Sequence, residues 1–269
     1  MPKTALIIPT YGQEEFTIRC FDSILKHTDD YLLVWMDNGS TEKSKQSVIN
    51  SFKQHKNRLS IWSDTNLGFV KGVNNGIEIL LNTPYGKDCE YFAILNNDIE
   101  VSATWLDKMT FILESDNKIG AIGPVSSAES SLQGWKRLFK SSGIQQYPNL
   151  KELDTDARGK ILDSYFNTKH IEAPMGISCP MVAFFCTIFR KEIFQKVGLL
   201  DPIYGLGYGD DDDLCLRIYN NEYKIRVSLG SYVFHNHKTT FNATLSKEEI
   251  RHIKRTNRSK LEKKFKIKS

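Results

Sequence analysis

Hydrophobic and polar residues alternate in blocks along the first hundred positions of the chain. The short apolar run TALIIPT (4–10) is closed by a proline and predicts a buried strand. The next segment, EEFTIRCFDSILKH, has apolar residues at helical spacing, and this exchange of strand and helix repeats as far as YFAILNND (91–98). Strands that alternate with helices imply right-handed crossovers. The pattern therefore predicts an α/β fold with a mostly parallel, Rossmann-like central sheet flanked by helices.

The alternation weakens after Val125. Residues 126–160 are polar and aperiodic, and we expect them to form a variable or mobile segment. A buried strand is predicted again at 179–190, a short helix at 191–201, and two further strands at 223–228 and 231–235. Residues 245–269 hold ten Lys or Arg and three Glu, so we expect a basic C-terminal helical tail.

Composition and cysteine usage narrow the class of protein. With 269 residues, 40% of them hydrophobic and 25% charged, the chain suits one large α/β domain with an appendage. It has no apolar run long enough for a membrane span or a signal peptide, so we expect a cytoplasmic protein. The five cysteines are scattered, which favours reduced thiols over a disulfide framework or a zinc site. Any bound metal should therefore have oxygen ligands.

Polar side chains follow each of the first four predicted strands. Ligands of parallel α/β sheets bind at the carboxyl ends of the strands, so these residues form the candidate site. Turn formation or helix capping explains any one of them, but explains four successive strand ends less well. The strand-end residues are Thr10 and Tyr11, Asp37 and Asn38, Asp64 to Asn66, and Asn96, Asn97 and Asp98.

Six motifs follow one another along the chain: IIPTYGQ, VWMDNGST, NLGFVKGVNNG, ILNNDIE, FRKEIFQKVGLLD and GYGDDDDLCLR. Their ordered combination resembles the family 2 glycosyltransferases of the GT-A fold, especially the bacterial rhamnosyltransferase-like branch. The resemblance implies one GT-A domain over residues 1–244, with a nucleotide-binding half to about residue 125 and a smaller acceptor and catalytic half from about residue 126. Residues 245–269 would form the helical tail. The implied activity is inverting transfer of a sugar from a nucleotide diphosphate donor to an acceptor hydroxyl, in polysaccharide or glycoconjugate synthesis.

The resemblance also implies a donor site. It places the nucleotide base near Asp37, whose carboxylate can accept the N3–H of uracil or thymine, and so favours a UDP or dTDP donor. Lys71 is the only cation near the third motif, and a solvated helix lysine accounts for it about as well as a phosphate contact. The implied nucleotide-sugar-binding residues are Pro9, Thr10, Tyr11, Asp37, Asn38, Asn66, Gly68, Lys71, Asn74, Asn96, Asn97, Asp98 and Asp210.

A divalent cation, Mn²⁺ or Mg²⁺, is implied at the donor diphosphate, where it would offset the negative charge of the leaving group. The family's Asp-x-Asp motif corresponds here to Asn96-Asn97-Asp98, so Asp98 is the implied metal ligand and Asn96 lacks one negative charge. Hard oxygen ligands suit both ions. A later histidine of the family matches His235 best, and His237, on the same face of a predicted strand, is the substitute.

Four successive aspartates at the start of a predicted helix match the position of the family's catalytic base. Inverting transfer needs a carboxylate that takes the proton of the attacking hydroxyl, and the resemblance assigns this role to Asp211. Asp210 would help to shape the site, Asp212 would be solvated, and Asp213 would support the helix start or pair with Arg217. The glycine-rich loop 204–209 before them could close over a bound donor or form a simple turn.

Two other functions stay open at this point. A nucleotidyltransferase would share the sheet and the metal site but would release pyrophosphate, and the Asp-rich helix start suits base catalysis better. A noncatalytic carbohydrate-binding protein would accommodate Asn96 and Val73, which depart from the family pattern. Only donor turnover separates these functions.

The expected partners are a nucleotide diphosphate sugar donor and a carbohydrate or lipid-linked glycan acceptor. Nucleic acid is not expected, because no basic and aromatic array accompanies the basic tail. The tail is expected to be a solvated helix, with contact to the inner face of an anionic membrane as the alternative. Aromatic residues that could stack on sugar rings or belong to the core are Trp135, Tyr147, Tyr165 and Phe166.

Overall fold

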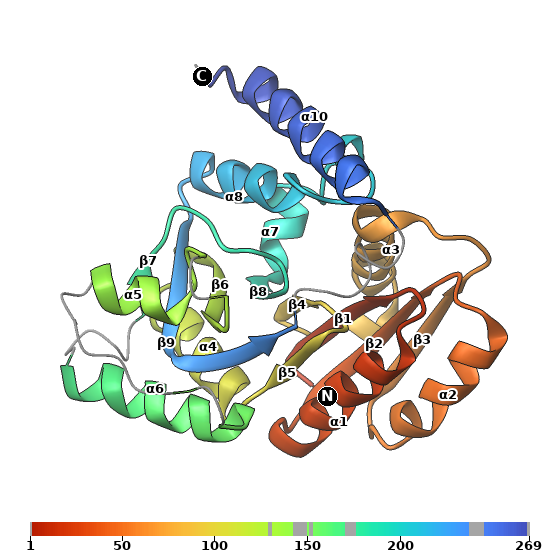
Figure 1. The fold of residues 1–269 in the computed structure, drawn as a ribbon, viewed down its shortest axis with the longest axis horizontal. Helices are drawn as coiled ribbons and strands as arrows, with labels where there is room; N and C mark the ends of the chain where they lie inside the picture. The colour runs from red at the N-terminus through yellow and green to blue at the C-terminus, as the bar shows by residue number, and fades with distance from the viewer. Residues whose placement is uncertain are drawn as a thin grey trace.

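A mixed sheet with helices on both sides forms the centre of the molecule (Figure 1). The computed structural model describes residues 2–128, 131–141, 150, 153–169, 176–236 and 245–267. The strand order is β3-β2-β1-β4-β8-β6-β9-β5, and β7 pairs with β9. The strands are β1 (Thr4–Thr10), β2 (Tyr31–Asn38), β3 (Arg58–Ser63), β4 (Tyr91–Leu95), β5 (Ile99–Val101), β6 (Ile119–Ser126), β7 (Ile177–Ser178), β8 (Cys186–Arg190) and β9 (Lys224–His235).

The first four strands of this order are parallel to one another, as predicted. Of these, β1, β2 and β4 are buried along their whole length and mostly apolar, because side chains of successive residues point to opposite faces and both faces are covered. The edge strand β3 is only partly buried. In β1, Ala5 and Ile7 belong to one buried core, whereas Leu6 and Ile8 belong to the other. The α/β fold with a helix-flanked sheet is confirmed.

Two groups of helices cover the two faces of the sheet. The helices α1 (Glu14–His27), α2 (Glu42–Lys53) and α4 (Trp105–Ser115) pack on the face that holds Leu6 and Ile8. The helices α3 (Gly68–Asn82), α7 (Lys191–Lys196) and α8 (Asp210–Asn220) pack on the other face. The remaining helices are α5 (Trp135–Ser141), α6 (Thr155–Lys169), α10 (Lys247–Phe265) and the 3₁₀ helices η1 (Pro84–Gly86) and η3 (Pro202–Tyr204).

The second half differs from the prediction in several elements. The strand expected over 179–190 is limited to β8, which runs antiparallel to β4 and β6. The irregular segment expected over 126–160 contains α5 and the start of α6, because Trp135, Leu138 and Leu162 insert into the core. Trp135 is thus a core residue, whereas Tyr147 and the side chains of Tyr165 and Phe166 lie outside what the structure describes.

The two strands expected at 223–228 and 231–235 are one strand, β9. Pro124 of β6 pairs with Ser228, and the next residue, Val125, pairs with Tyr232, so three residues of β9 form a bulge. The hydroxyl groups of Ser228 and Ser231 lie 2.9 Å apart inside this bulge. The bulge lets β9 continue beyond β6 to pair with β5, where Ile99 lies opposite His235.

The C-terminal helix α10 lies across α8 at the top of the molecule (Figure 1). It begins at a capping box between Ser246 and Glu249. The ammonium group of Lys264 lies 2.6 Å from carboxylate oxygens of both Asp201 and Asp213. The expectation of a solvated tail is therefore wrong for one face of this helix. None of the described helices is both long and apolar enough to cross a membrane.

Asp213 joins α10 to the first turn of α8. Its side chain is fully buried and accepts hydrogen bonds from Arg217 Nε at 2.6 Å, Lys264 Nζ at 2.6 Å and the Tyr204 hydroxyl at 3.1 Å. The pair with Arg217 was expected from the sequence, and the pair with Lys264 was not. A buried carboxylate with two cationic partners is costly to neutralise, because Arg217 then loses its counter-charge and Lys264 loses one of its two.

We expect Asp213→Asn to lower the free energy of unfolding by about 2–4 kcal/mol, measured by urea denaturation. The matched control is Asp107→Asn, which changes an exposed aspartate in the first turn of α4. Its effect should stay within about 0.5 kcal/mol. Equal effects of the two substitutions would contradict a structural role for the Asp213 ion pairs.

Candidate active site

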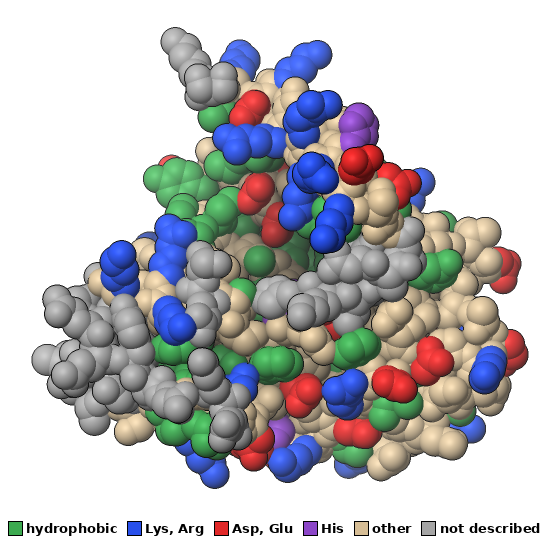
Figure 2. All heavy atoms as spheres, viewed as in Figure 1, with side chains coloured by type: hydrophobic (Ala, Val, Ile, Leu, Met, Phe, Trp, Pro, Cys, Tyr) green, Lys and Arg blue, Asp and Glu red, His purple; other side chains and the backbone are tan. Residues whose placement is uncertain are grey.

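A cavity of about 1160 Å³ opens at the carboxyl ends of the parallel strands. In the space-filling view it corresponds to the hollow below α10, where acidic and hydrophobic side chains meet (Figure 2). Its volume suffices for a nucleotide-sized ligand. The structure brings twelve of the sequence-predicted site residues together in its wall: Pro9, Thr10, Tyr11, Asn38, Asn66, Gly68, Asn96, Asn97, Asp98, Asp210, Asp211 and His235.

Three predicted donor-binding residues do not line this cavity. Asp37 is buried, and its carboxylate accepts hydrogen bonds from the Thr10 hydroxyl at 3.4 Å and the Ser40 amide at 3.0 Å. Asn74 is also buried, and its side-chain amide forms two hydrogen bonds with the backbone of Leu200. Lys71 is exposed on α3. Direct donor contacts of these three residues stay predictions.

The start of α3 faces the cavity because a chain of hydrogen bonds positions it. Gly68, the first residue of α3, has a φ of 78° and accepts a hydrogen bond from Asn38 Nδ2 at its carbonyl oxygen, at 2.9 Å. Its amide donates to Asn66 Oδ1 at 2.9 Å. A side chain at Gly72 would collide with Asn38. These two asparagines therefore orient the helix N-terminus, a favourable environment for an anionic group.

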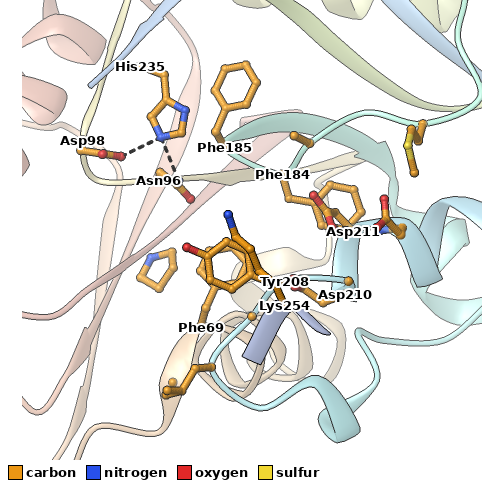
Figure 3. Close-up of a pocket in the computed structure, with 18 of the residues that line it drawn as sticks. Phe69, Asn96, Asp98, Phe184, Phe185, Tyr208, Asp210, Asp211, His235 and Lys254 are labelled. Carbon is orange, nitrogen blue, oxygen red and sulfur yellow. Dashed lines mark hydrogen bonds and ion pairs between the residues drawn. The ribbon is translucent and has the colours of Figure 1, made fainter. Parts of the chain in front are cut away.

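Asp98 and His235 meet because β5 pairs with the end of β9. His235 Nε2 lies 3.1 Å from Asp98 Oδ1 and 3.2 Å from Asn96 Nδ2, and its ring stacks on Phe185 with centroids 4.9 Å apart (Figure 3). The Ser127 hydroxyl donates a hydrogen bond to the carbonyl oxygen of His235 and accepts one from its amide. The imidazole is therefore fixed in the cavity wall. His237, its predicted substitute, lies outside the described residues.

The described residues contain no group of three or more His, Cys, Asp or Glu side chains that could hold a metal ion. The pair Asp98 and His235 nevertheless fits two positions of a metal shell. Neighbouring ligands of an octahedral Mg²⁺ lie roughly 3 Å apart, since each metal–ligand bond is about 2.1 Å long. The observed separation of 3.1 Å matches this spacing. Donor oxygens and water would have to supply the other ligands.

The four aspartates occupy the first turn of α8. Gly209, with a φ of 102°, precedes the helix and accepts the first helical hydrogen bond from the Asp213 amide at 2.9 Å. Asp211 lines the cavity on the side away from Asp98 and His235 in the close-up (Figure 3). Asp212 also lines the cavity and is half-buried.

Burial raises the pKa of Asp210, Asp211 and Asp212. Desolvation, with a smaller contribution from the charge of Asp211, raises the pKa of Asp210 to about 8. Desolvation and then the charge of Asp212 raise the pKa of Asp211 to about 6. At neutral pH Asp210 is therefore mainly protonated and Asp211 mainly ionised. A carboxylate with a pKa near neutrality is suited to accept a proton from a substrate.

The glycine-rich loop before α8 is held by α10. Asn257 is buried, and its side-chain amide donates hydrogen bonds to the carbonyl oxygens of Tyr204 at 3.0 Å and Gly207 at 2.8 Å. Lys260 Nζ donates to the Ile203 carbonyl oxygen at 2.7 Å. The loop is thus attached to the C-terminal helix, and any closure over a ligand has to involve that helix.

Sequence reasoning missed the contribution of α10 to the cavity. Lys254, Arg258, Leu261 and Glu262 line it, although the basic tail was interpreted as a surface feature. The available signal was Leu261, an apolar residue one turn from Asn257 within a basic helix. A face with that composition is typical of a helix that packs on the protein.

A family model and two curated proteins match parts of this chain. A family model described as Glycosyl transferase family 2 matches residues 5–198. The teichoic acid poly(glycerol phosphate) polymerase of Staphylococcus epidermidis is 32% identical over 130 residues, which cover 47% of this chain and 17% of that protein. An uncharacterized glycosyltransferase of Haemophilus influenzae is 25% identical over 123 residues, 45% of this chain and 36% of that protein. The chain thus matches only a minor part of the length of either relative.

Two solved structures share the fold. The structure of GalNAc-T7 with UDP, GalNAc and Mn²⁺ has a TM-score of 0.62 and 15% identity, and the match covers 87% of this chain and 44% of that one. The mannosyltransferase PcManGT from Pyrobaculum calidifontis, in complex with GDP-Man and Mn²⁺, has a TM-score of 0.59 and 15% identity, with 90% and 59% covered. The predicted GT-A fold is confirmed by these likenesses.

We expect Asp210→Asn to stabilise the protein increasingly as the pH rises. A buried carboxyl whose folded pKa is raised contributes its full stability below its unfolded pKa and loses it as the pH rises from about 4 to about 8. Asparagine has no proton to lose, so the gain in melting temperature over wild type should reach about 5 °C at the upper end of this range. Asp213→Asn should lower the melting temperature under the same conditions. A pH-independent effect of Asp210→Asn would contradict the raised pKa.

Proposed function

The chain belongs to glycosyl transferase family 2, and we propose that it transfers a sugar from a nucleotide diphosphate sugar to an acceptor hydroxyl, with inversion at the anomeric carbon. One observation carries the proposal. A single cavity has the Asp98 and His235 pair on one side and, on the other, the carboxyl group of Asp211, whose pKa is raised by burial. These are the two groups that such a transfer needs, one at the leaving group and one at the attacking hydroxyl.

The donor would occupy the part of the cavity formed by the parallel strand ends. Tyr11 and Thr10 would contact the base, and the amide-rich start of α3 at Gly68 would face the diphosphate. The carboxylate of Asp37 accepts a hydrogen bond from the Thr10 hydroxyl. Asp37 therefore bears on the proposed preference for UDP or dTDP only by positioning Thr10. The assignment of this chain to the rhamnosyltransferase-like branch is proposed from the sequence motifs alone.

Asp98 and His235 would hold Mn²⁺ or Mg²⁺, as their separation permits. When bound, the ion offsets negative charge on the diphosphate leaving group. Both solved neighbours contain Mn²⁺, which supports a divalent metal in this fold. Asn96 contacts the same Nε2 atom of His235, so a bound ion would replace this hydrogen bond.

Asp211 would act as the base. As the acceptor hydroxyl oxygen forms a bond to the anomeric carbon, the bond from that carbon to the donor diphosphate breaks, and Asp211 takes the hydroxyl proton. The oxygen attacks opposite the leaving group, so the configuration inverts. Asp210, protonated at neutral pH, leaves Asp211 free to ionise.

The acceptor is proposed to be a carbohydrate or a lipid-linked glycan in polysaccharide or glycoconjugate synthesis. The matched relative from Staphylococcus epidermidis, which is named for teichoic acid poly(glycerol phosphate), supports this area of metabolism. A cytoplasmic location, with α10 near the inner face of a membrane, would suit such an acceptor.

A screen of nucleotide sugars for Mn²⁺-dependent hydrolysis tests the proposed function. We expect release of free nucleoside diphosphate from at least one UDP or dTDP sugar by the wild-type protein. Asp98→Ala should lose this turnover, because the metal loses its carboxylate ligand. Asp211→Asn should bind the donor normally and lower transfer by about 10²–10⁴-fold.

Asp107→Asn, on the far helix α4, serves as the activity control and should not change turnover. Release of pyrophosphate would instead identify a nucleotidyltransferase. No turnover of any nucleotide sugar would favour a noncatalytic carbohydrate-binding protein. Near-normal transfer by Asp211→Asn would assign the base to another residue.

The rate should depend on pH through Asp211. Because the base must be ionised, kcat/KM is expected to fall as the pH drops below about 6 and to level off above it. Donor binding, measured separately by tryptophan fluorescence at each pH, should not follow the same curve. If donor binding fell over the same pH range, the fall of kcat/KM at acidic pH would come from the donor site and not from the base.

A further inference from the structure

The glycine-rich loop 204–209 has an unusual backbone directly before the proposed base. Tyr208 has a φ of 66°, although a residue with a Cβ atom is disfavoured in this region. Three glycines of the loop also have positive φ angles: Gly205 (59°), Gly207 (134°) and Gly209 (102°). A conformation of this kind persists only where the surrounding structure holds it. The contacts that hold the loop therefore also influence the position of Asp211, two residues further on.

Asn257 of α10 makes the central contact with this loop. Its side chain is buried, and Nδ2 donates hydrogen bonds to the carbonyl oxygens of Tyr204 at 3.0 Å and Gly207 at 2.8 Å. The Oδ1 atom accepts a hydrogen bond from Lys260 Nζ at 2.9 Å. Both N–H groups of the amide and its oxygen are thus used. Together the three hydrogen bonds define one orientation of the Asn257 side chain.

The hydrogen bond to Gly207 acts on the backbone torsion of Tyr208. The carbonyl group of Gly207 and the nitrogen of Tyr208 belong to one planar peptide unit. Because Asn257 fixes this carbonyl, it fixes the plane from which Tyr208 turns into its positive φ. The ring of Tyr208 also contacts α10, since Lys254 Nζ lies 4.6 Å from the ring centroid. The helix therefore holds both the backbone and the side chain of Tyr208.

The end of the loop also acts on the carboxyl group of Asp211. Burial and the charge of Asp212 raise the pKa of Asp211, and backbone amides that include the one of Gly209 oppose this rise. Gly209 lies close to the clamped residues, because a Cβ atom there would be 3.2 Å from the Tyr204 ring and 3.7 Å from Cβ of Asn257. The conformation of the loop thus reaches the base through an amide that favours its ionised form.

We propose that Asn257 is a positioning residue, which holds the loop 204–209 in the conformation that places Asp211 at the attacking hydroxyl. Asn257 does not line the cavity, so it acts through the loop and not on a ligand. A misplacement of about 1 Å in a reacting constellation can lower the rate about 10²-fold. This inference rests on the proposed function, because it concerns the base of that reaction.

Asn257→Leu tests the proposal, because leucine keeps a branched side chain of similar size and has no donor for the two carbonyl oxygens. The substrate is the UDP or dTDP sugar that the wild-type protein hydrolyses. We expect kcat to fall by about 10–100-fold, while KM for the nucleotide sugar stays within about twofold. Hydrogen exchange of the loop amides, followed by mass spectrometry, should become at least about tenfold faster. A raised KM with an unchanged kcat would assign the loop to donor binding and overturn the proposal.

Thr28→Val is the matched control for lost stability. The Thr28 hydroxyl is buried and accepts a hydrogen bond at 2.8 Å from Nε1 of Trp105, which belongs to the core on the other face of the sheet. Each of the two substitutions leaves a polar group without its partner and should lower the melting temperature by a few degrees. Only Asn257→Leu should lower kcat and accelerate exchange in the loop. Equal falls of kcat in the two variants would overturn the positioning role and leave a general contribution to stability.

Lys260→Met provides a second test that leaves the Asn257 amide in place. Lys260 is half-buried, does not line the cavity, and donates hydrogen bonds to both Asn257 and the Ile203 carbonyl oxygen. Without this cation the amide is held less firmly, so kcat should fall by about three- to tenfold at an unchanged KM. Lys263→Met removes the same charge from an exposed position of the helix and should change kcat less than about twofold. If Asn257→Leu does not fold, equal kcat values of these two variants overturn the proposal.

Turnover by the wild-type protein separates failure of this inference from failure of the proposed function. Absence of nucleotide-sugar hydrolysis by wild type overturns the proposed function, and the positioning role with it. Hydrolysis by wild type together with an unchanged kcat of Asn257→Leu overturns only the role of Asn257.

Discussion

The carboxylate of Asp213, fully buried at the start of α8, is held by Arg217 of the same helix and by Lys264 of α10. This ion-pair cluster connects two elements that are separated in the chain by the whole of β9. Because Asp211 belongs to the same helical turn as Asp213, the position of the proposed base depends on the cluster. Lys264 also sets the position of α10, and with it the positions of Lys254, Arg258 and Leu261, which line the cavity.

A second constraint acts on the opposite side of the cavity. The three residues of β5 pair with the last residues of β9, and this pairing brings the side chains of Asp98 and His235 beside each other. The bulge between Ser228 and Tyr232 lets one strand serve two partners, β6 and then β5. The two sides of the cavity are thus set by different parts of the chain. A ligand that spans the cavity would contact both, which suits a reaction between two bound molecules.

The sequence predicts the first half of the fold well and the second half poorly, for identifiable reasons. The strands through Leu6 and Trp35 are buried on both faces and flanked by amphipathic helices, so local patterns suffice. The strand β5 is only three residues long, and few of the described side chains of α5 and α6 are buried, so these elements leave no periodic signal. Convergence of the strand-end residues follows from topology, whereas the contribution of α10 depends on long-range contacts such as Asn257 with Gly207. A composition count cannot reveal those contacts.

Four adjacent carboxylates can share one helical turn because each has a different electrostatic environment. Asp213 has two cations, and Asp212 faces the cavity near Arg258, so both can carry charge. Asp210 has the higher pKa of the two remaining groups, about 8, and therefore keeps its proton at neutral pH while Asp211 loses its own. With a proton on Asp210, the neighbouring charge that acts on Asp211 is that of Asp212. A protonated carboxyl at Asp210 therefore adds no negative charge that would oppose ionisation of the proposed base.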